Sequence, residues 1–444
     1  MTYTTLADGA SALQRSPMLG DPALLELFPE GIFHFDDVLS VFSQPSYELP
    51  NGRTLGQLLR DLDEVPQDPE WHGEGSVWQH LRLVVPQARK LGQQLPPLPR
   101  AALMLAALLH DVGKAQCTKL ATVNGRERIV SPRHAEAGRN LLVCALSAAL
   151  PPLLWQQVVE LVGTHHHPRQ LVEDSRSADA FYGLVARVDP RLLFLLEEAD
   201  LRGRFARDQD SELDTLRLFQ LECESLGLWP QEDWAACDAD LASRDPYREW
   251  RARISEAFPK AELAQRVFYR SCRDFETGNI HSVEEGIARG YALADAPHLA
   301  LTCGPSGSGK SRWAKEQAAH FDEIISLDAL REELTGDERE QGENARVVAL
   351  ARERLREALR KRRNVIWDAT SLRRDFRRIV VQLGWDYGAF VSISAFAAPL
   401  PVLRTTLAQR QRAIPESVLL RQLASLQWPE RHEADAVFWY GAAG

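Results

Sequence analysis

A glycine-rich segment in the last third of the chain has the residue types that bind phosphate. It fits the pattern G-x-x-x-x-G-K-[ST], follows the apolar run Leu299–Cys303 and precedes a helical pattern, the context that phosphate binding needs. In such a loop, backbone N–H groups curl around phosphate oxygens, the lysine neutralises their charge and the final serine holds Mg²⁺. We expect ATP or another nucleoside triphosphate with Mg²⁺ or Mn²⁺; the alternative is a Gly/Ser-rich loop that binds no nucleotide. The expected nucleotide-binding residues are Gly304, Ser306, Gly307, Ser308, Gly309, Lys310 and Ser311, with Lys310 also acting in catalysis.

Three charged residues downstream of the loop are candidates for the site of a phosphate acceptor. Asp328 ends the apolar run Ile324–Leu327, at the edge of an α/β sheet where ligands bind, and is the general-base candidate. Arg331 would share a helix face with Asp328 and could clamp an anionic group of the acceptor. Asp368 closes the apolar run Val365–Trp367 and would lie near Mg²⁺ or touch the acceptor. The alternative is a helix-capping aspartate beside a surface arginine.

A second arginine-bearing segment precedes Ile414-Pro415 near the end of the chain. Arginines in such a segment suit a lid that steadies charge during phosphoryl transfer. We expect Arg404 to contact the nucleotide and Arg410 and Arg412 to act in catalysis. Solvated helix arginines are the competing interpretation, and the sequence leaves open which arginine matters most.

A further set of residues combines imidazoles with carboxylates. His110-Asp111 closes the apolar run Ala101–Leu109, with His80 upstream and Asp200 downstream. These donors suit a divalent metal and leave positions for water and a phosphate oxygen, so the hydrolysis of phosphate esters follows. His134 and His165 or His166 could hold a second metal that shares Asp111. The candidate metal ligands are His80, His110, Asp111, Asp200, His134, His165 and His166.

Positive groups accompany these ligands. Lys114 and Arg204 suit the scissile phosphate, and His72 is a further candidate for contact with the substrate. A lone histidine on an apolar face is usually a satisfied core residue, but seven of the 12 histidines lie between His72 and His167. The sequence does not choose between one metal and two, nor among His165, His166 and His167 as ligands.

Two architectures must position these residues. From Val77 to about Glu249 the apolar spacing is helical, which predicts an all-α domain. After Pro297, short apolar runs alternate with helical segments, which predicts an α/β domain with a parallel sheet. The predicted organisation is an accessory region at 1–69, a metal-dependent phosphohydrolase domain at 70–250, a helical linker at 251–296 and a P-loop kinase domain at 297–444.

Composition narrows the class of protein. The 444 residues are 45% hydrophobic, which is enough for two or three hydrophobic cores. No apolar run is long enough to span a bilayer, so we expect a cytoplasmic protein. The six cysteines are scattered, and we expect them to be reduced. The net charge is -10, but residues 301–444 hold 22 Lys+Arg against 19 Asp+Glu, leaving 30 against 43 before them. The basic run Arg352–Arg378 is either a nucleic-acid contact or a solvated helix surface.

The order of these motifs resembles known families. His80, His110-Asp111 and Asp200, with H-D-x-G-K and G-T-H-H-H-P, look like the HD phosphohydrolase superfamily over roughly residues 70–250. The second half resembles 5′-hydroxyl polynucleotide kinases, which carry a P-loop, an Asp-x-x-Arg and an arginine-rich lid. Together they resemble the bacterial HD-domain polynucleotide kinase-phosphatases, which phosphorylate 5′-OH ends and remove 2′,3′-cyclic, 2′- or 3′-phosphates.

The resemblance implies roles for the candidate residues. Asp328 would activate the 5′-hydroxyl, and Arg331 would engage an acceptor phosphate. One or two divalent ions, such as Mn²⁺, Ni²⁺, Co²⁺ or Fe²⁺, would occupy the histidine and aspartate ligands. DNA or RNA ends would be the substrates, and because no ligase-like lysine motif is present, a separate ligase would seal them.

Two other hypotheses use the same residues. In the first, a small-molecule or nucleotide kinase of the toxin-like P-loop type is fused to an HD nucleotide phosphohydrolase. In the second, nucleotide binding switches partner contacts and the HD domain is a degenerate binder. The complete set of His80, His110, Asp111 and Asp200 argues against the second.

Overall fold

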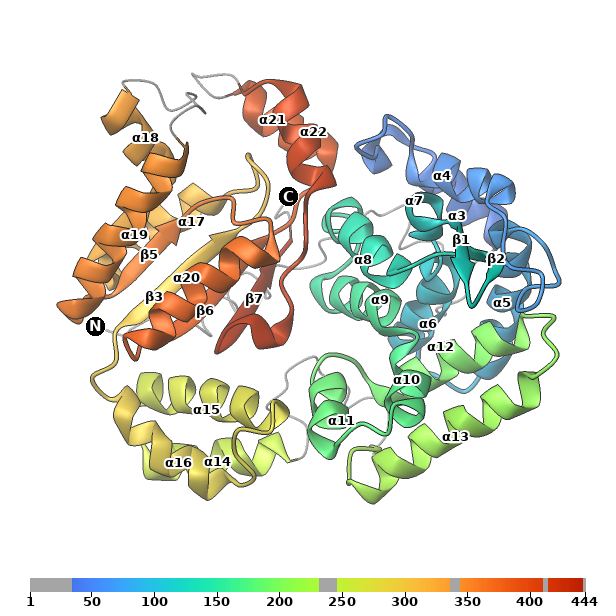
Figure 1. Cartoon of the computed structure of the whole chain (residues 1–444), viewed down its shortest axis with the longest axis horizontal. Helices are drawn as coiled ribbons and strands as arrows, with labels where there is room; N and C mark the ends of the chain where they lie inside the picture. Colours follow the sequence, from blue (N-terminus) through green and yellow to red (C-terminus); the bar gives the residue numbers. More distant parts are fainter. Residues whose placement is uncertain (1–33, 231–245, 336–343, 410–413, 442–444) are drawn as a thin grey trace. The chain divides into compact units, whose positions relative to one another are not determined.

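The computed structural model describes residues 34–230, 246–335, 344–409 and 414–441 (Figure 1). The chain divides into two compact units, one formed mainly by Ser16–Arg248 and the other by Glu249–Ala398 and Val402–Ala442. The first is helical and contains the histidine cluster, and the second contains the sheet and the glycine-rich loop. We describe each unit by itself.

The helical unit is built around one apolar helix, α6. Every residue from Ala101 to Leu109 in this helix is buried, and α5, α9 and α12 pack against it. The helix ends at His110, its C-cap residue, so the polar pair His110-Asp111 follows directly from the most apolar segment. The helices of this unit are α3 (Phe35–Phe42), α4 (Leu55–Asp61), α5 (Val77–Leu91), α6 (Pro97–Leu109), α7 (Lys114–Cys117), α8 (His134–Ala145), α9 (Pro152–Thr164), α10 (His167–Glu173), α11 (Ala178–Val185), α12 (Pro190–Arg202) and α13 (Gln209–Ser225).

A β-hairpin that the sequence analysis did not anticipate interrupts the helices. Strands β1 (Lys119–Val123) and β2 (Arg126–Val130) pair antiparallel, and Asn124 and Gly125 join them with φ angles of 51° and 76°. Asn-Gly is the preferred pair for this left-handed two-residue turn. From β2, Arg128 donates its Nε to Asp68 Oδ2 at 2.7 Å, which ties the hairpin to the segment before α5.

The described part of the predicted accessory region belongs to the helical unit. Helix α4 contacts both α3 and the 3₁₀ turn η2 (Leu62–Glu64), and α4 and η2 contact α5. Leu55, Leu59 and Leu62 are fully buried in this packing. A further 3₁₀ turn, η1, spans Pro45–Tyr47.

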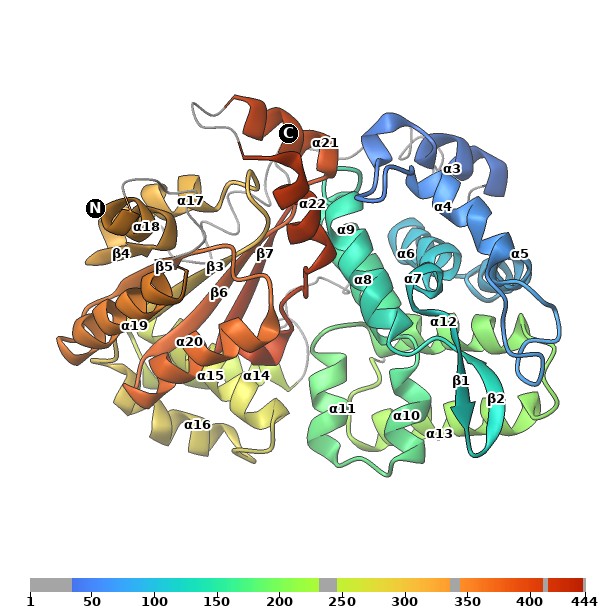
Figure 2. The ribbon, with the colours of Figure 1, turned by 45° about the horizontal axis from the view of Figure 1, so that its top comes forward.

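The second unit has a five-stranded sheet whose strands all run parallel, in the order β4-β5-β3-β6-β7 (Figure 2). The central strand β3 is buried at every position, as the apolar run before the glycine-rich loop predicts. Helices α19 and α20 contact each other and cover the sheet (Figures 1 and 2). The strands are β3 (His298–Cys303), β4 (Glu323–Ser326), β5 (Val365–Asp368), β6 (Phe390–Phe396) and β7 (Ala436–Tyr440).

The remaining elements of this unit connect the strands or precede them. The helices are α14 (Tyr247–Ala257), α15 (Ala261–Glu276), α16 (Val283–Gly290), α17 (Lys310–Glu316), α18 (Leu327–Thr335), α19 (Asn344–Arg360), α20 (Arg374–Asp386), α21 (Leu400–Ala408) and α22 (Glu416–Ala424). Three 3₁₀ turns are η5 (Tyr291–Leu293), η6 (Ala318–His320) and η7 (Arg431–Glu433).

The segment predicted as a linker packs against the sheet. Helix α15 contacts β7, and its Arg270 donates Nη2 to Asp435 Oδ2 at 2.6 Å. Glu276, the last residue of the same helix, accepts a hydrogen bond from His432 Nε2 at 2.8 Å. Helices α14 to α16 are therefore part of the sheet-containing unit.

No helix in the described ranges is both long and apolar enough to cross a bilayer.

The buried side chain of His298 should make the stability of the sheet-containing unit depend on pH. Its Nε2 lies 2.8 Å from Ser392 Oγ on β6, and burial, assisted by Arg266, lowers its pKa to about 3. Between the pKa of about 6.5 in the unfolded chain and the pKa of about 3 in the folded protein, His298 is protonated in the unfolded chain but remains neutral in the folded protein. Protonation of His298 should therefore not reduce the free energy of unfolding above pH 6.5. From pH 6.5 toward pH 3 it should reduce that free energy by up to about 1.4 kcal/mol per pH unit.

The comparison is between the wild type and His298→Asn. The free energy of unfolding is measured by urea unfolding at pH 4 to 7, with hydrogen exchange of the β3 amides as a local probe. This free energy should fall less steeply with decreasing pH in the variant than in the wild type. Equal pH slopes in the two proteins would contradict this origin of the acid sensitivity.

Candidate active sites

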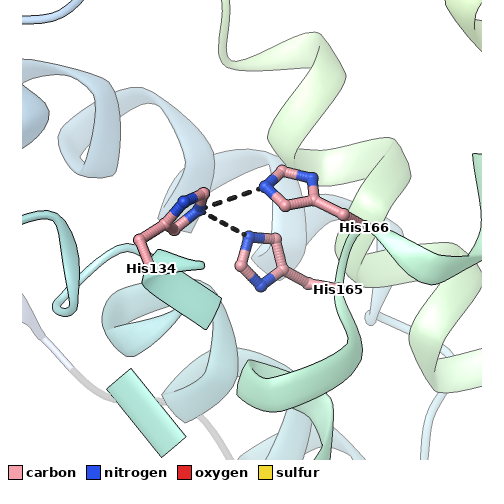
Figure 3. A group of neighbouring side chains, drawn as sticks. All are labelled: His134, His165 and His166. Atoms are coloured by element: carbon pink, nitrogen blue, oxygen red, sulfur yellow. Dashed lines mark hydrogen bonds between the residues drawn. The ribbon is translucent and has the colours of Figure 1, made fainter. Parts of the chain in front are cut away.

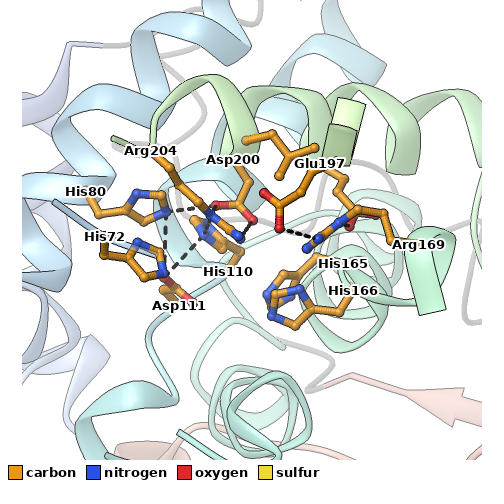
Figure 4. A network of polar contacts seen from close by, with 12 residues as sticks. His72, His80, His110, Asp111, His165, His166, Arg169, Glu197, Asp200 and Arg204 are labelled. Atoms are coloured by element: carbon orange, nitrogen blue, oxygen red, sulfur yellow. Dashed lines mark hydrogen bonds and ion pairs between the residues drawn. The ribbon is translucent and has the colours of Figure 1, made fainter. Parts of the chain in front are cut away.

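Three helices bring the first group of predicted metal ligands together (Figure 4). His80 lies on α5, His110 and Asp111 follow α6, and Asp200 lies on α12. His80 Nε2 is 2.8 Å from Asp200 Oδ1, and His110 Nε2 is 3.4 Å from Asp111 Oδ2 and 3.7 Å from Asp200 Oδ1. All four side chains are buried, so charged groups from distant parts of the sequence meet inside an apolar core.

A second group of three histidines lies beside the first (Figure 3). His134 begins α8, and His165 and His166 join α9 to α10. His134 Nε2 lies 3.3 Å from His165 Nε2, 3.1 Å from His166 Nε2 and 3.1 Å from Asp111 Oδ1. Asp111 therefore contacts both groups, through a different carboxylate oxygen in each.

Hydrogen bonds to the backbone orient three of these imidazoles. His110, His134 and His165 each place Nδ1 against the carbonyl oxygen three residues upstream, at 3.0, 2.8 and 2.8 Å. A carbonyl only accepts, so Nδ1 donates and Nε2 is left to face the cluster. The facing Nε2 atoms of His134 and His165 would then present two lone pairs to each other, an arrangement that a cation between them relieves.

The donor set therefore fits a divalent ion. Imidazoles whose second nitrogen is held by a carbonyl, together with carboxylates, form the usual environment of a protein metal site. His110 Nε2 is buried and has no hydrogen-bond partner within the described part of the chain. Burial alone would lower the pKa of His110, but Asp111 and Asp200 raise it to about 9, so this nitrogen takes either a proton or a metal ion.

Electrostatics keep the carboxylates ionised and two of the imidazoles neutral. Burial would raise the pKa of Asp111, but Lys114 and His110 outweigh it and hold that pKa well below 3.8. Burial lowers the pKa of His165 and of His166 well below 6.5. Ionised carboxylates and neutral imidazoles are the protonation states that bind metal.

Glu74 and Gln67 are parts of the site that the sequence analysis missed. Glu74 Oε1 lies 2.8 Å from His72 Nδ1 and 2.9 Å from His80 Nδ1, so this carboxylate orients His80 from behind. Lys114 Nζ lies 2.8 Å from Asp111 Oδ2 and donates to Gln67 Oε1 at 2.7 Å. Gln67 falls in the region predicted to be accessory, and only the spacing His72-Gly73-Glu74 could have signalled Glu74.

Two arginines lie beside the carboxylates of α12: Arg204, which follows this helix, and Arg169 on α10. Arg204 donates its Nε to Asp200 Oδ1 at 3.1 Å and its Nη2 to the other oxygen (Figure 4). One helical turn before Asp200, the fully buried Glu197 pairs with Arg169 at 2.5 Å, and burial raises its pKa to about 7. Sequence reasoning placed Arg204 near the cluster but did not find Glu197 or Arg169.

The glycine-rich loop of the second unit has the conformation that its sequence predicts. Gly304, Gly307 and Gly309 have φ angles of 145°, 89° and 98°, which other residues rarely adopt. A Cβ at Gly304 would lie 2.4 Å from the carbonyl oxygen of Phe396, so this position also requires the absence of a side chain. Buried Lys310 begins α17 and donates its Nζ to the carbonyl oxygen of Pro305 at 2.6 Å.

A glutamine from α22 contacts this loop. Gln422 Oε1 accepts from Ser306 N at 2.8 Å, and Gln422 Nε2 donates to Ser306 Oγ at 3.1 Å. Ser308 Oγ is buried without a partner among the described residues. No sequence signal marked Gln422 as a contact of the phosphate loop.

The predicted acceptor residues lie at the ends of the neighbouring strands β4 and β5, of which β5 pairs with β3. In the sheet register Ser326 at the end of β4 is paired with Asp368 at the end of β5. Thr302 Oγ1 of β3 lies 3.3 Å from Asp368 Oδ1, so Asp368 adjoins the strand that leads into the loop. Asp328 follows β4, is 70% exposed and accepts from Arg331 Nη1 at 2.7 Å, whereas the Arg331 side chain is only 10% exposed. The expected Asp-Arg pair on one helix face is therefore present.

The predicted lid is described only in part. Arg404 on α21 donates its Nε to Glu416 Oε1 on α22 at 2.8 Å, so its guanidinium is engaged between two helices. Arg410 and Arg412 lie outside the described residues.

Much of the basic run Arg352–Arg378 is neutralised by carboxylates. Arg354 pairs with Glu333 at 2.7 Å, and fully buried Arg377 pairs with Glu433 at 2.6 Å. An open cleft between α19 and α20 is lined by Arg352, Arg356 and Arg378, together with Asp386. The run therefore contributes less positive surface than its composition suggests.

Comparisons with known proteins agree with this division. Residues 77–202 match the HD domain family, and residues 299–429 match the AAA domain family. The chain contains an HD domain followed by a P-loop kinase-like AAA domain, which confirms the predicted fold class: a helical HD region and an α/β domain with a parallel sheet.

Similarity to individual proteins is limited. One match among solved structures is titled "Structure of the Pnkp1/Rnl/Hen1 RNA repair complex", with 26% identity and a TM-score of 0.28. The match covers 30% of this chain and 44% of that chain, so this chain spans less than half of its relative's length. No curated protein matches the sequence.

The outer contact of Glu74 predicts a measurable effect on metal affinity. Glu74→Gln keeps the shape of the side chain but removes the charge that orients His80, and loss of such a partner typically weakens metal binding by about 10–100-fold. Calorimetric titration of the metal-free protein with Mn²⁺ measures this change. Exposed Glu64→Gln is the control and should bind as the wild type does; equal affinities in all three proteins would rule out this role for Glu74.

Proposed function

We propose that this chain heals broken nucleic-acid ends. Its HD site would remove 2′,3′-cyclic, 2′- or 3′-phosphates with a divalent metal, and its P-loop site would phosphorylate 5′-OH ends with ATP. The observation that carries the proposal is the presence, in one chain, of a buried metal-ligand cluster and a phosphate loop with an adjacent Asp-Arg pair. These two sites suit opposite chemistries, and strand breaks that leave a 5′-OH and a phosphorylated 3′ end require both.

At the HD site, each side chain has a distinct task. His80, His110, Asp111 and Asp200 would hold one ion, and His134, His165 and His166 would hold a second that shares Asp111. A bound divalent ion, of which Mn²⁺, Ni²⁺, Co²⁺ and Fe²⁺ all suit these donors, would lower the pKa of water and polarise the ester.

The cations of the HD site would face the substrate phosphate. Lys114 and Arg204 already neutralise Asp111 and Asp200, so they lie where an incoming phosphate would meet positive charge. His72 would contact the substrate from the Glu74 side of the cluster.

At the kinase site, positioning and charge would do most of the work. Lys310 and the loop N–H groups would hold the ATP phosphates, and Ser311 would bind Mg²⁺ or Mn²⁺. Asp328 is exposed and would take the proton of the 5′-hydroxyl, while Arg331 would hold an acceptor phosphate. Asp368 would lie near the metal or the acceptor, and Arg404, Arg410 and Arg412 would form the lid.

The products explain why the two activities would share a chain. A ligase needs a 5′-phosphate and a 3′-hydroxyl, which are the ends that the two sites would produce together. A separate ligase would therefore act next, on DNA or on RNA.

A second candidate uses the same sites on smaller substrates. A nucleotide or small-molecule kinase fused to an HD nucleotide phosphohydrolase would need the same loop, Asp328 and metal ligands. The open cleft lined by arginines is compatible with either substrate class, because much of the surrounding charge is paired.

End-group analysis separates the two candidates. An oligonucleotide with a 5′-OH and a 2′,3′-cyclic phosphate, incubated with labelled ATP and a panel of divalent ions, should gain label at one end and lose phosphate at the other. Label that enters only nucleosides or small molecules, in a parallel incubation, would exclude end healing.

The two activities should separate by mutation. Lys310→Ala and Asp328→Ala should each lower 5′ phosphorylation by about 100-fold or more, since a loop lysine neutralises phosphate charge and a general base typically contributes 10²–10⁴. Both should leave phosphate release unchanged, whereas Asp111→Ala should abolish phosphate release and retain kinase activity. Lys315→Ala, exposed on the same helix as Lys310, is the control. Loss of both activities in folded single variants would contradict two independent sites.

A further inference from the structure

Phe205 is an exposed aromatic residue at the edge of the HD site. It follows Arg204 directly, and 65% of its surface is exposed. Its N–H donates to Glu74 Oε2 at 2.9 Å, and its carbonyl oxygen accepts from Gly73 N at 3.2 Å. The backbone of Phe205 is therefore fixed to the same carboxylate that orients His72 and His80.

The local packing holds this residue in place without using its ring. A Cβ at Gly73 would lie 2.9 Å from the Phe205 carbonyl oxygen and 3.3 Å from its Cβ, so the two segments approach closely only because residue 73 is glycine. On the other side, Arg204 is anchored to Asp200. Burial of a phenylalanine ring stabilises a fold, and most of that stabilisation is absent here because the ring is exposed.

The surroundings of Phe205 have the character of a surface for single-stranded nucleic acid. Arg207, two residues on, is exposed and makes no ion pair with any residue in the described ranges. Trp71, on the segment that leads to His72, is 40% exposed. Aromatic faces combined with unpaired cations bind single strands, because every base can stack and every phosphate is anionic.

We propose that Phe205 forms a base-stacking subsite for the HD reaction. The nucleobase of the terminal nucleotide would lie on the Phe205 ring while its 2′- or 3′-phosphate enters the metal site. Stacking accepts any base, so the subsite would select nucleotide ends over simple phosphate esters without selecting a sequence. This inference rests on the proposed function, because it requires a nucleotide as the substrate of the HD site.

The experiment compares substrates that differ only in the terminal base. Phosphate release is measured for an oligonucleotide 3′-phosphate with a normal terminal nucleotide, for the same oligonucleotide with an abasic terminal residue, and for p-nitrophenyl phosphate. The proteins are the wild type, Phe205→Ala, Phe205→Trp and, as a control, Leu221→Ala, an exposed apolar residue of α13 in the same unit.

Phe205→Ala should raise KM for the normal end by about 5- to 150-fold, the range expected for loss of one base stack. It should leave kcat, Mn²⁺ affinity and the KM for the abasic end and the simple ester near their wild-type values. Phe205→Trp should retain the low KM, and Leu221→Ala should behave as the wild type does. A merely structural role for Phe205 would change all substrates and the metal affinity together.

Two outcomes would overturn the inference: an unchanged KM in Phe205→Ala, or an equal change for the normal and abasic ends. A wild type that releases phosphate from no oligonucleotide end would instead refute the proposed function. In that case the same comparison, made between a nucleoside 3′-phosphate and a ribose phosphate, decides the role of Phe205 separately.

Discussion

The helical unit depends on neutralising two carboxylates inside an apolar core. Asp111 and Asp200 are each 1% exposed, and an unpaired buried charge would cost several kcal/mol. Compensation comes from Lys114, Arg204 and the surrounding imidazoles, which several helices bring to one place. The packing of α5, α6, α9 and α12 therefore serves the polar cluster as much as the apolar core.

The two groups of donors are linked because Asp111 belongs to both. Its Oδ1 faces His134 and its Oδ2 faces Lys114 and His110. A cation at either group would change the field at the other through this carboxylate. The outer residues Glu74 and Gln67 extend the same network to the segment before α5, so a metal ion bound at the cluster would be coupled to the folding of that segment.

Different kinds of information were available in the sequence for different parts of the molecule. The apolar run of α6 and the motif around Lys310 are local signals, and both form the elements that the sequence predicts, a buried helix that ends at His110 and a helix that begins at Lys310. The hairpin also carried a local signal, Asn124-Gly125 between alternating residues, but the surrounding helical periodicity concealed it. Glu197 and Gln422 could not be inferred, because their partners lie on other elements and only the packed chain brings them together.

Gln422 occupies a hydrogen-bonding group of the glycine-rich loop when no phosphate is bound. The N–H of Ser306 is one of the groups such a loop offers to phosphate, and a side-chain carbonyl already occupies it. The Gln422 side chain thus satisfies the hydrogen-bonding groups of Ser306 in the absence of a phosphate. A phosphate oxygen bound at the Ser306 N–H would replace Gln422 Oε1 as the acceptor and free the Gln422 side chain. The contacts of α22 with the loop would therefore differ between the empty and the phosphate-bound loop.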